Sequence, residues 1–292
     1  MDSPQRDIDS TVERAARHWQ LTLGERLAGG TRSAVRAATD AEGRDLVLKV
    51  PEARADRSTV TAAEAAALQA WQDTGAAVSL LDATPEALLL TRCRPGTYAP
   101  WRATEPLDEL VGIAAELLGR LWSADPGPYP FQRLADRYRL DERTARQDAA
   151  YERRARGEPD RGAAGVDRLS AAAAAAGWMM TSAPSVALLH GDFITKNLVR
   201  DDAAPLGWVA LDPLPMIGEP ACEVAAFAAY QPAELIMPTA ESLAALTHVS
   251  QHRALVWAAI WSVHQSAQAW RDDQTDVDRL VSGPAIAELL RA

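Results

Sequence analysis

The sequence has only two cysteines among its 292 residues, and neither belongs to a CxxC or Cys/His metal-binding pattern. This scarcity excludes a disulfide-rich scaffold, and we expect Cys93 and Cys222 to be small buried side chains in a reducing compartment. Long apolar runs are missing too: no stretch approaches the roughly 18 residues that a membrane-spanning helix needs. Residues 1–10 lack the basic-then-apolar pattern of a signal peptide. These absences predict a cytoplasmic protein that does not bind membranes.

Basic residues are outnumbered, with 30 Lys and Arg against 40 Asp and Glu, so the formal net charge is −10. An acidic chain is a poor candidate for a protein whose main partner is nucleic acid. The charge suits a cationic small molecule drawn to an acidic cleft, although acidity that serves only solubility explains it more simply. A chain of this length can bury a large core, and we expect it to divide into two lobes.

Three polar residues stand at the edges of apolar runs that we interpret as short buried strands: Asp192, Asn197 and Asp212. Asn197 follows Asp192 by five residues, and Asp212 follows Asn197 by fifteen. Phosphoryl transfer needs one carboxylate to take the proton of the acceptor hydroxyl, and an amide oxygen and a second carboxylate to hold Mg²⁺. The three residues offer these groups in the order and spacing of a kinase catalytic loop. His190-Gly191-Asp192 by itself fits an ordinary turn equally well, so the hypothesis also needs an N-terminal half that binds ATP.

The N-terminal half has the pattern of a small antiparallel sheet. We expect the order strand, strand, strand, helix, strand, strand, with strands at 23–27, 45–50, 78–83 and 87–93, a hairpin turn within 37–44 before the third strand, and helices at 11–22 and 58–71. Gly29, Gly30 and Thr31 would let backbone N–H groups approach nucleotide phosphates. A plain hairpin turn explains these three residues equally well, so this signal is weak.

Lys49 lies between apolar residues in a strand that is expected to be buried, where an unpaired ammonium would be costly. Glu64 is the acidic residue in the middle of the alanine-rich helix 58–71, which makes it the natural partner of Lys49. The alternative is a glutamate that faces solvent. A strand lysine paired with a helix glutamate is how kinase-like folds hold the phosphates of ATP.

The C-terminal half is predicted to be mainly helical. After a hinge at 90–94 and a turn at 94–97, we expect helices at 107–122, 131–158, 162–177 and 221–230, an irregular loop at 213–220, and about three helices in 239–292. Glu223 suits the first turn of its helix and could also brace the catalytic loop from behind. Trp257, Trp261 and His264 follow helical spacing, which favours core packing over substrate stacking. The predicted lobes are 1–93, which binds ATP, and 94–292, which carries out catalysis and binds the substrate.

Taken together, several segments resemble the aminoglycoside and hydroxyurea antibiotic resistance kinases, and within that group the streptomycin 6-kinases. The segments are Asp45–Val50, Glu64–Trp71, Arg94–Thr97, Leu188–Asn197, Trp208–Pro213 and Gly218–Ala225. The resemblance covers about residues 20 to 230. It implies an α+β, two-lobed protein-kinase-like fold, with a small antiparallel-sheet N-lobe that carries one helix and a larger, mainly helical C-lobe.

The resemblance also implies O-phosphorylation of a small hydroxyl compound with ATP, or GTP as the alternative donor, and Mg²⁺. Asp192 would be the catalytic base, Asn197 and Asp212 the Mg²⁺ ligands, Lys49 the ligand of the α- and β-phosphates, and Glu64 the residue that orients Lys49. Members of the family usually continue His-Gly-Asp with Leu-His-x-x-Asn, whereas this chain has Phe193-Ile194-Thr195-Lys196. This departure puts the substrate in doubt more than the reaction, and Lys196 is a candidate contact for the γ-phosphate.

Three alternatives stay open at this point. The enzyme could be a metabolic kinase of a sugar, an amino sugar or another small alcohol, or the chain could be a kinase-like binding protein without turnover. A protein kinase is disfavoured, because GxGxxG, Asp-Phe-Gly and Ala-Pro-Glu are all missing. Candidates to receive a cationic substrate are Glu219, Glu223, Asp272 and Asp273. The sequence makes no prediction of oligomeric state.

Overall fold

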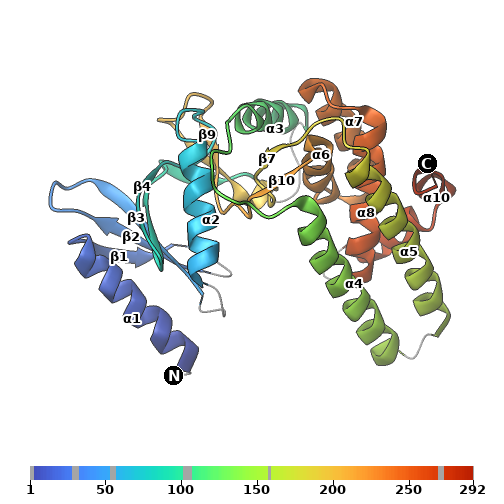
Figure 1. Ribbon diagram of the computed structural model, residues 1–292, viewed down its shortest axis with the longest axis horizontal. Coiled ribbons are helices and arrows are strands. Elements are labelled where there is room, and N and C mark those ends of the chain that lie inside the picture. The colour runs from blue at the N-terminus through green and yellow to red at the C-terminus, as the bar shows by residue number, and fades with distance from the viewer. Residues whose placement is uncertain are drawn as a thin grey trace. The chain divides into compact units, whose positions relative to one another are not determined.

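The computed structural model describes residues 3–27, 33–52, 57–100, 107–156, 159–268 and 273–291 (Figure 1). Gly29, Gly30, Thr31 and Asp272, all named above as candidates, lie outside these residues. The chain forms two compact units. The first comprises Met1–Ala99, Ala124–Pro130 and Lys196–Pro215, and the second Pro100–Ser123, Phe131–Thr195 and Met216–Ala292. The division into lobes at residues 93 and 94 stays a prediction.

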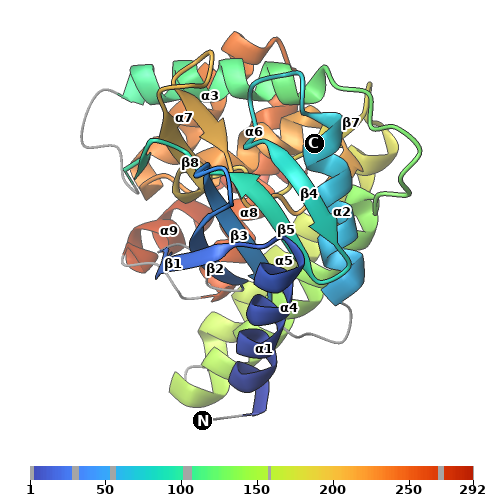
Figure 2. The ribbon, with the colours of Figure 1, turned by 90° about the vertical axis from the view of Figure 1, so that its left-hand side faces the viewer.

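The first unit is built on a five-stranded antiparallel sheet with the order β1-β2-β3-β5-β4 (Figure 2). Its strands are β1 (Thr22–Arg26), β2 (Ser33–Thr39), β3 (Asp45–Pro51), β4 (Leu80–Thr84) and β5 (Ala87–Thr91). The turn between β2 and β3 has Gly43 at φ 79°, a conformation that glycine adopts without steric cost. Asp40 stabilises the same turn by accepting a hydrogen bond from the backbone N–H of Arg44 (2.8 Å). The strands predicted at 23–27, 45–50, 78–83 and 87–93 correspond to β1, β3, β4 and β5, and their limits agree within two residues at each end.

Two helices pack on this sheet, α1 (Ser3–His18) and α2 (Arg57–Ala70). The expected helix at 11–22 was wrong in its limits, because the helix begins at Ser3 and its last turn gives way to Gln20, at φ 53°. Ile8, Val12, Ala15 and Ala16 of α1 are buried against a sheet face that includes Leu46, Leu48 and Val50 of β3. Because successive strand residues point to opposite faces, α1 covers the face away from Lys49.

A second, three-stranded antiparallel sheet completes the first unit, in the order β6 (Pro95–Tyr98), β8 (Leu198–Asp201) and β9 (Trp208–Ala210). The prediction that 94–97 is only a turn was wrong, because Pro95–Tyr98 pairs with β8. The backbone N–H of Ala99 continues this pairing by donating to the Leu198 carbonyl (2.9 Å). A four-residue edge strand takes its conformation from its partner strand, which its own sequence does not reveal.

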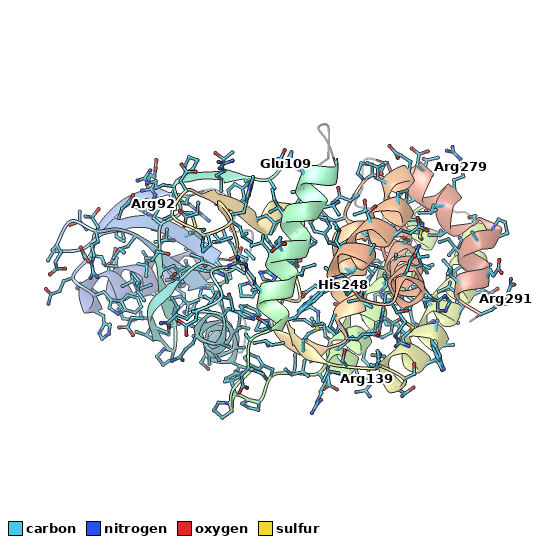
Figure 3. The ribbon with its side chains drawn as sticks, turned by 90° about the horizontal axis from the view of Figure 1, so that it is seen from above. Arg92, Glu109, Arg139, His248, Arg279 and Arg291 are labelled. Atoms are coloured by element: carbon cyan, nitrogen blue, oxygen red, sulfur yellow. The ribbon has the colours of Figure 1, made fainter. Side chains whose placement is uncertain are left out.

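The second unit is mainly helical. Its helices are α3 (Leu107–Trp122), α4 (Leu134–Arg156), α5 (Pro159–Thr181), α6 (Pro220–Ala229), α7 (Ile236–Thr247), α8 (Gln251–Gln268), α9 (Gln274–Val281) and α10 (Pro284–Leu289). The apolar core gathers around α8, whose Trp257 and Ile260 are fully buried. Charged ends such as those of Arg139, Arg279 and Arg291 lie at the surface (Figure 3). Among the described residues, no helix combines the length and the apolar character that crossing a membrane would require.

The second unit also holds a short antiparallel pair, β7 (Ala187–Leu189) with β10 (Met216–Gly218). The irregular loop expected at 213–220 was therefore wrong for these three residues. Gly218 is needed here, because a Cβ at this position would lie 2.8 Å from Leu134 Cβ. The loop that carries Gly191 and Asp192 begins at His190, the residue after β7. The fold class is α+β, as predicted.

Candidate functional site

The centre of the candidate site is a buried cluster of three charged side chains in the first unit. Lys49 of β3 is 5% exposed, and its Nζ lies 2.6 Å from Glu64 Oε1 of α2. The same ammonium forms an ion pair with the carboxylate of Asp212, which follows β9. The pairing of Lys49 with Glu64 expected from the sequence is thus present. The contact with Asp212, 163 residues away along the chain, was not foreseen.

The electrostatics of this cluster leave it short of positive charge. Burial alone would lower the pKa of Lys49, but the carboxylates of Glu64 and Asp212 raise it above its usual value, so the ammonium is charged. Burial raises the pKa of Glu64, and the negative charge of Asp212 adds to this effect against the opposing effect of Lys49. One ammonium therefore serves two carboxylates. A further cation beside Asp212 would balance the charge.

Asp212 is held in an unusual backbone conformation, with φ 55°. A non-glycine residue in the left-handed region is uncommon, and its cost is accepted where the surrounding structure requires it. The preceding residue is tied down, because the Leu211 N–H donates to the backbone carbonyl of Asn197 (2.8 Å). Asn197 ends a short 3-10 helix (Thr195–Asn197) and is 6% exposed. This backbone hydrogen bond thus links Asn197 to the residue that precedes Asp212.

These two residues suit a magnesium ion that also binds phosphates. Amide and carboxylate oxygens are the hard donors that Mg²⁺ prefers, and it usually takes only one or two carboxylates from the protein. The Asp212 side chain is 37% exposed, so it has oxygen surface free for an ion. The described residues contain no group of three or more His, Cys, Asp or Glu side chains able to hold a metal by themselves. An ion at this position would therefore complete its coordination with phosphate and water.

A cavity of about 320 Å³ opens beside the cluster, entirely within the first unit. Small-molecule sites typically begin at about 300 Å³ and combine apolar walls with a few polar groups. The walls have this character. They comprise Leu27, Val35, Val47, Val78, Leu90, Val199 and Leu211, with Lys49 and Asp212 at the polar side. The cavity can thus hold an apolar ring while the polar side receives charged groups.

The predicted hinge at 90–94 contributes all five of its residues to the lining of this cavity. Cys93 is partly exposed there, so the expectation of a buried core thiol was wrong for it and right for Cys222. Burial raises the pKa of Cys93 to about 12, and the nearby charge of Asp201 adds to the shift, so the thiol stays protonated. Tyr98 also lines the cavity and was missed, because its segment was interpreted as following a turn.

In the second unit, Glu223 supports the loop that carries Asp192. Glu223 Oε1 accepts a hydrogen bond from the backbone N–H of Gly191 (2.7 Å), and Oε2 accepts one from Trp122 Nε1 (2.9 Å). Burial raises the pKa of Glu223 to about 7, despite these hydrogen bonds, and the charge of Asp192 adds to the rise. Glu223 therefore braces the loop, which is one of the roles predicted for it. Trp122 was missed, because it looked like one more core residue of an amphipathic helix.

The rest of this loop is fixed by apolar packing. His190 and Phe193 are fully buried, with their rings edge to face at a centroid distance of 5.8 Å. Phe193 also contacts Phe227 of α6. Ile194 is 7% exposed, so the two apolar residues that depart from the family pattern, Phe193 and Ile194, pack into the core. Lys196 is exposed, and its role toward the γ-phosphate stays a prediction.

Of the acids considered for a cationic substrate, Glu219 is unsuitable. It is 3% exposed, and its carboxylate forms an ion pair with Arg253 and accepts a hydrogen bond from Trp257 Nε1 (2.9 Å). Glu223 is equally buried and occupied. Asp273 accepts a hydrogen bond from the backbone N–H of Ala233 (3.0 Å). Sequence reasoning could not tell these acids apart, because their partners lie far along the chain.

The aromatic face of α8 is core, as predicted. Trp257 is fully buried and stacks on Trp261 at a centroid distance of 6.1 Å. His264 is 3% exposed, and its Nε2 lies 3.1 Å from the Tyr138 hydroxyl. Burial lowers the pKa of His264 to about 4, and the positive charge of Arg146 lowers it further, so the ring is neutral at pH 7.

Comparison with known proteins identifies one family. The model of the aminoglycoside/hydroxyurea antibiotic resistance kinases matches residues 18–274. No curated protein matches the chain significantly in sequence.

Several solved structures share the fold. A choline/ethanolamine kinase family protein from Mesorhizobium loti is 15% identical, with 97% of each chain covered and a TM-score of 0.60. A putative fructosamine-3-kinase from Thermobifida fusca is 16% identical, with 98% of this chain and 100% of that chain covered and a TM-score of 0.57. The streptomycin–ATP–APH(2'')-IIa ternary complex is 13% identical, with 96% and 97% covered and a TM-score of 0.59. At these identities the likeness shows the fold alone, which is protein-kinase-like.

Proposed function

The chain belongs to the aminoglycoside/hydroxyurea antibiotic resistance kinase family, and we propose that it transfers the γ-phosphoryl group of ATP to a hydroxyl of a small cationic molecule. Membership makes it a phosphotransferase with an alcohol group as acceptor. The observation that supports a nucleotide as the phosphoryl donor is the Lys49–Glu64–Asp212 cluster at the polar side of an apolar cavity. A solved structure of the same fold was obtained with ATP, which supports ATP over GTP.

In this proposal, the apolar walls and the hinge backbone hold the base, and the Lys49 ammonium binds the α- and β-phosphates. Glu64 keeps Lys49 charged and pointed at the cavity. A bound Mg²⁺, held by Asn197 and Asp212, would neutralise the phosphate charge. Asp192 accepts the proton of the acceptor hydroxyl while Glu223 holds the Asp192 loop through Gly191. Most of the rate enhancement comes from positioning and from charge stabilisation, with little covalent work for the protein.

The acceptor we propose is an aminoglycoside of the streptomycin type. The family description supports an aminoglycoside, and the net charge of −10 suits a substrate that carries two guanidinium groups. A structure of the same fold was solved with streptomycin. Other structures of this fold are a choline/ethanolamine kinase family protein and a putative fructosamine-3-kinase. They support the alternative of a metabolic kinase for an amino alcohol or amino sugar. The proposed location is the cytoplasm.

An acceptor panel tests this proposal. Purified protein with ATP and Mg²⁺ is incubated with streptomycin, other aminoglycosides, hydroxyurea, choline, ethanolamine, fructosamine and simple sugars, and phosphorylated products are detected by mass spectrometry. We expect streptomycin to gain one phosphate. Phosphorylation of choline or an amino sugar instead would favour the metabolic alternative. Nucleotide binding without transfer to any acceptor would favour the non-catalytic one.

The same assay tests the catalytic base. Asp192→Ala should lower turnover by about 10²-fold or more, the usual contribution of a positioned general base. The nucleotide cavity lies in the first unit and does not include Asp192. Binding of Mg²⁺–ATP to the variant should therefore stay at the wild-type level. Full turnover by the Asp192→Ala variant with the acceptor found in the panel would show that the assignment is wrong.

A further inference from the structure

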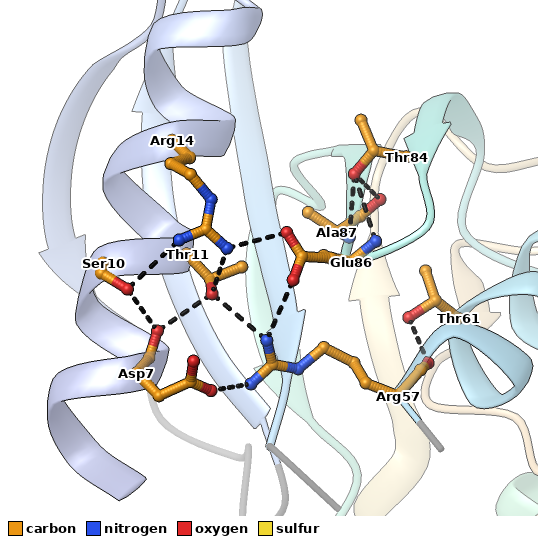
Figure 4. Close-up of polar contacts among 9 residues, drawn as sticks. All are labelled: Asp7, Ser10, Thr11, Arg14, Arg57, Thr61, Thr84, Glu86 and Ala87. Carbon is orange, nitrogen blue, oxygen red and sulfur yellow. Dashed lines mark hydrogen bonds and ion pairs between the residues drawn. The ribbon is translucent and has the colours of Figure 1, made fainter. Parts of the chain in front are cut away.

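A cluster of polar side chains joins α1, the start of α2 and the turn between β4 and β5 (Figure 4). Arg57 opens α2 and donates hydrogen bonds to two residues of α1, from Nη2 to Asp7 Oδ2 (2.7 Å) and from Nη1 to Thr11 Oγ1 (3.2 Å). Its Nη1 also lies 3.5 Å from Glu86 Oε1 in the turn. The Arg57 side chain is only 10% exposed. The guanidinium therefore ties α2 to two other elements at once.

Arg57 and Glu64 lie on the same side of α2. They are seven residues apart, which is two helical turns and about 10 Å along the axis. Thr61, between them, is fully buried and donates from its hydroxyl to the Arg57 backbone carbonyl (2.9 Å). The side chains of Glu64 and Arg57 thus project from the same face of α2, and they contact Lys49 and α1 respectively.

The two ends of α2 are held in different ways. Leu68 is 1% exposed within the last turns, and Trp71, directly after the helix, is also 1% exposed. In the N-terminal part of α2, from Arg57 to Glu64, the buried residues are Thr61 and Glu64, and Val60 is 47% exposed. No large apolar side chain of this part is buried, so the hydrophobic effect does little to fix it. Polar contacts hold this part instead, and those of Arg57 tie its start to α1 and to the turn between β4 and β5.

Helix α1, to which Arg57 is hydrogen-bonded, is held on the sheet by its own apolar side chains. α1 lies on the sheet through Ile8, Val12, Ala15 and Ala16, on the face opposite Lys49. None of the residues that line the cavity belongs to the buried cluster under α1. α1 can therefore act as a fixed support for α2.

We propose that Arg57 is a positioning residue that holds Glu64 against Lys49 by tying the start of α2 to α1. This inference rests on the proposed function, because it assigns Arg57 an effect on the lysine that binds phosphates. Without the tie, α2 pivots about its apolar C-terminal end and Glu64 moves away from Lys49. The ammonium then pairs with Asp212 alone, and so competes with Mg²⁺ for that carboxylate.

The test compares binding of Mg²⁺–ATP and of adenosine to the full chain by isothermal titration calorimetry. Adenosine has no phosphates, so it reports on the cavity without Lys49. Arg57→Ala should weaken Mg²⁺–ATP by about tenfold, within the usual range for coupling through packed elements, and leave adenosine unchanged. The matched control is Arg14→Ala. Arg14 bonds Ser10, Thr11 and Glu86 in the same cluster but makes no described contact with α2, so both ligands should bind as to wild type.

Asp7→Asn is a second variant that weakens the tie while it leaves Arg57 in place. It tests the proposal even if Arg57→Ala does not fold. It should weaken Mg²⁺–ATP in the same direction but less, because Thr11 and Glu86 still hold the guanidinium. Its effect should be non-additive with that of Arg57→Ala. Equal losses for adenosine and Mg²⁺–ATP would indicate a merely structural role and overturn the inference.

Lys49→Met separates the two proposals. If Lys49→Met loses Mg²⁺–ATP affinity while Arg57→Ala and Asp7→Asn bind it like wild type, the positioning role alone is overturned. If Lys49→Met binds Mg²⁺–ATP like wild type, the proposed function is wrong and the positioning role falls with it.

Discussion

Each unit of this protein buries a charged cluster, and the two clusters differ in completeness. In the first unit, the Lys49 ammonium faces two carboxylates, and one of them, Asp212, is 37% exposed beside a cavity. In the second unit, the Arg253 guanidinium meets one carboxylate, that of Glu219, and also donates to Ser182 Oγ (3.0 Å) and the Met179 carbonyl (2.6 Å). The second cluster is balanced in charge and enclosed. The first cluster has one carboxylate in excess and is open to the cavity.

This difference separates a buried charge that serves a ligand from one that serves the fold. A buried ion pair stabilises only when every donor and acceptor is satisfied. Each side-chain nitrogen of Arg253 and each carboxylate oxygen of Glu219 has a hydrogen-bond partner, and the pair joins α5, α6 and α8. The Lys49 cluster keeps an excess carboxylate at an open cavity, a poor arrangement for stability and a good one for binding a metal–phosphate complex. If the Arg253 cluster serves stability and the Lys49 cluster serves ligand binding, substitutions in the two clusters should have opposite effects.

Arg253→Met should give the largest effect, a loss of about 3–5 kcal/mol in the free energy of unfolding, because it leaves the Glu219 carboxylate buried without its partner. Urea denaturation measures the change, and phosphoryl transfer per folded molecule should stay near wild type. Arg139→Met is the matched control, since Arg139 is exposed and, among the residues that the structure describes, pairs with its helix neighbour Asp136. A loss of activity without a loss of stability in Arg253→Met would break the comparison.

Lys49→Met should show the opposite pattern. We expect kcat/KM for phosphoryl transfer to fall by about 10²–10³-fold, the usual contribution of one charge-stabilising group. Stability should fall less than in Arg253→Met, because Glu64 can take up a proton and Asp212 is partly exposed to water. Steady-state kinetics and urea denaturation on the same preparation give both numbers. A stability loss as large as that of Arg253→Met would mean that this cluster also serves the fold.

Glu223 should make the second unit sensitive to pH. Its pKa is raised from 4.5 to about 7, so between these values the folded protein keeps a proton that the unfolded chain has lost. Wild-type stability should therefore fall as pH rises through this window. Turnover should fall as pH drops below about 7, because a proton on the carboxylate displaces Trp122 or Gly191. Glu223→Gln should flatten the pH dependence of stability and that of turnover near pH 7. If both pH profiles of the variant matched those of wild type, Glu223 would not have the predicted role of bracing the Asp192 loop.

Trp178→Ala should have the smallest effect. The Arg253 guanidinium lies over the Trp178 ring at 5.3 Å from its centroid, and an exposed cation–π contact contributes about 0.5–1 kcal/mol. We expect thermal unfolding to show this loss with no change in transfer rate. Val186→Ala is the control, because Val186 is similarly exposed at 57% and takes part in none of the cation–π contacts of the described residues.

Much of the local structure could be predicted because its signals lie within a few residues. A short apolar run from Leu46 to Val50, interrupted by Lys49, predicted strand β3. A lysine inside that strand required an acid nearby, which the alanine-rich helix supplied as Glu64. The missed strands β6 and β10 are four and three residues long. Their conformation depends on β8 and β7, which pair with them from distant parts of the chain.

By itself, the sequence determined the order and chemistry of the candidate site residues, from Lys49 and Glu64 to Asp192, Asn197 and Asp212. It did so because the spacing of polar residues in apolar runs is a local property. Only the tertiary structure decided which acids are free. Glu219 and Glu223 stand four residues apart in one segment, yet one neutralises Arg253 and the other braces the backbone before Asp192. The physical reason is that burial and charge pairing depend on neighbours in space, and folding brought those neighbours from 34 and 32 residues away.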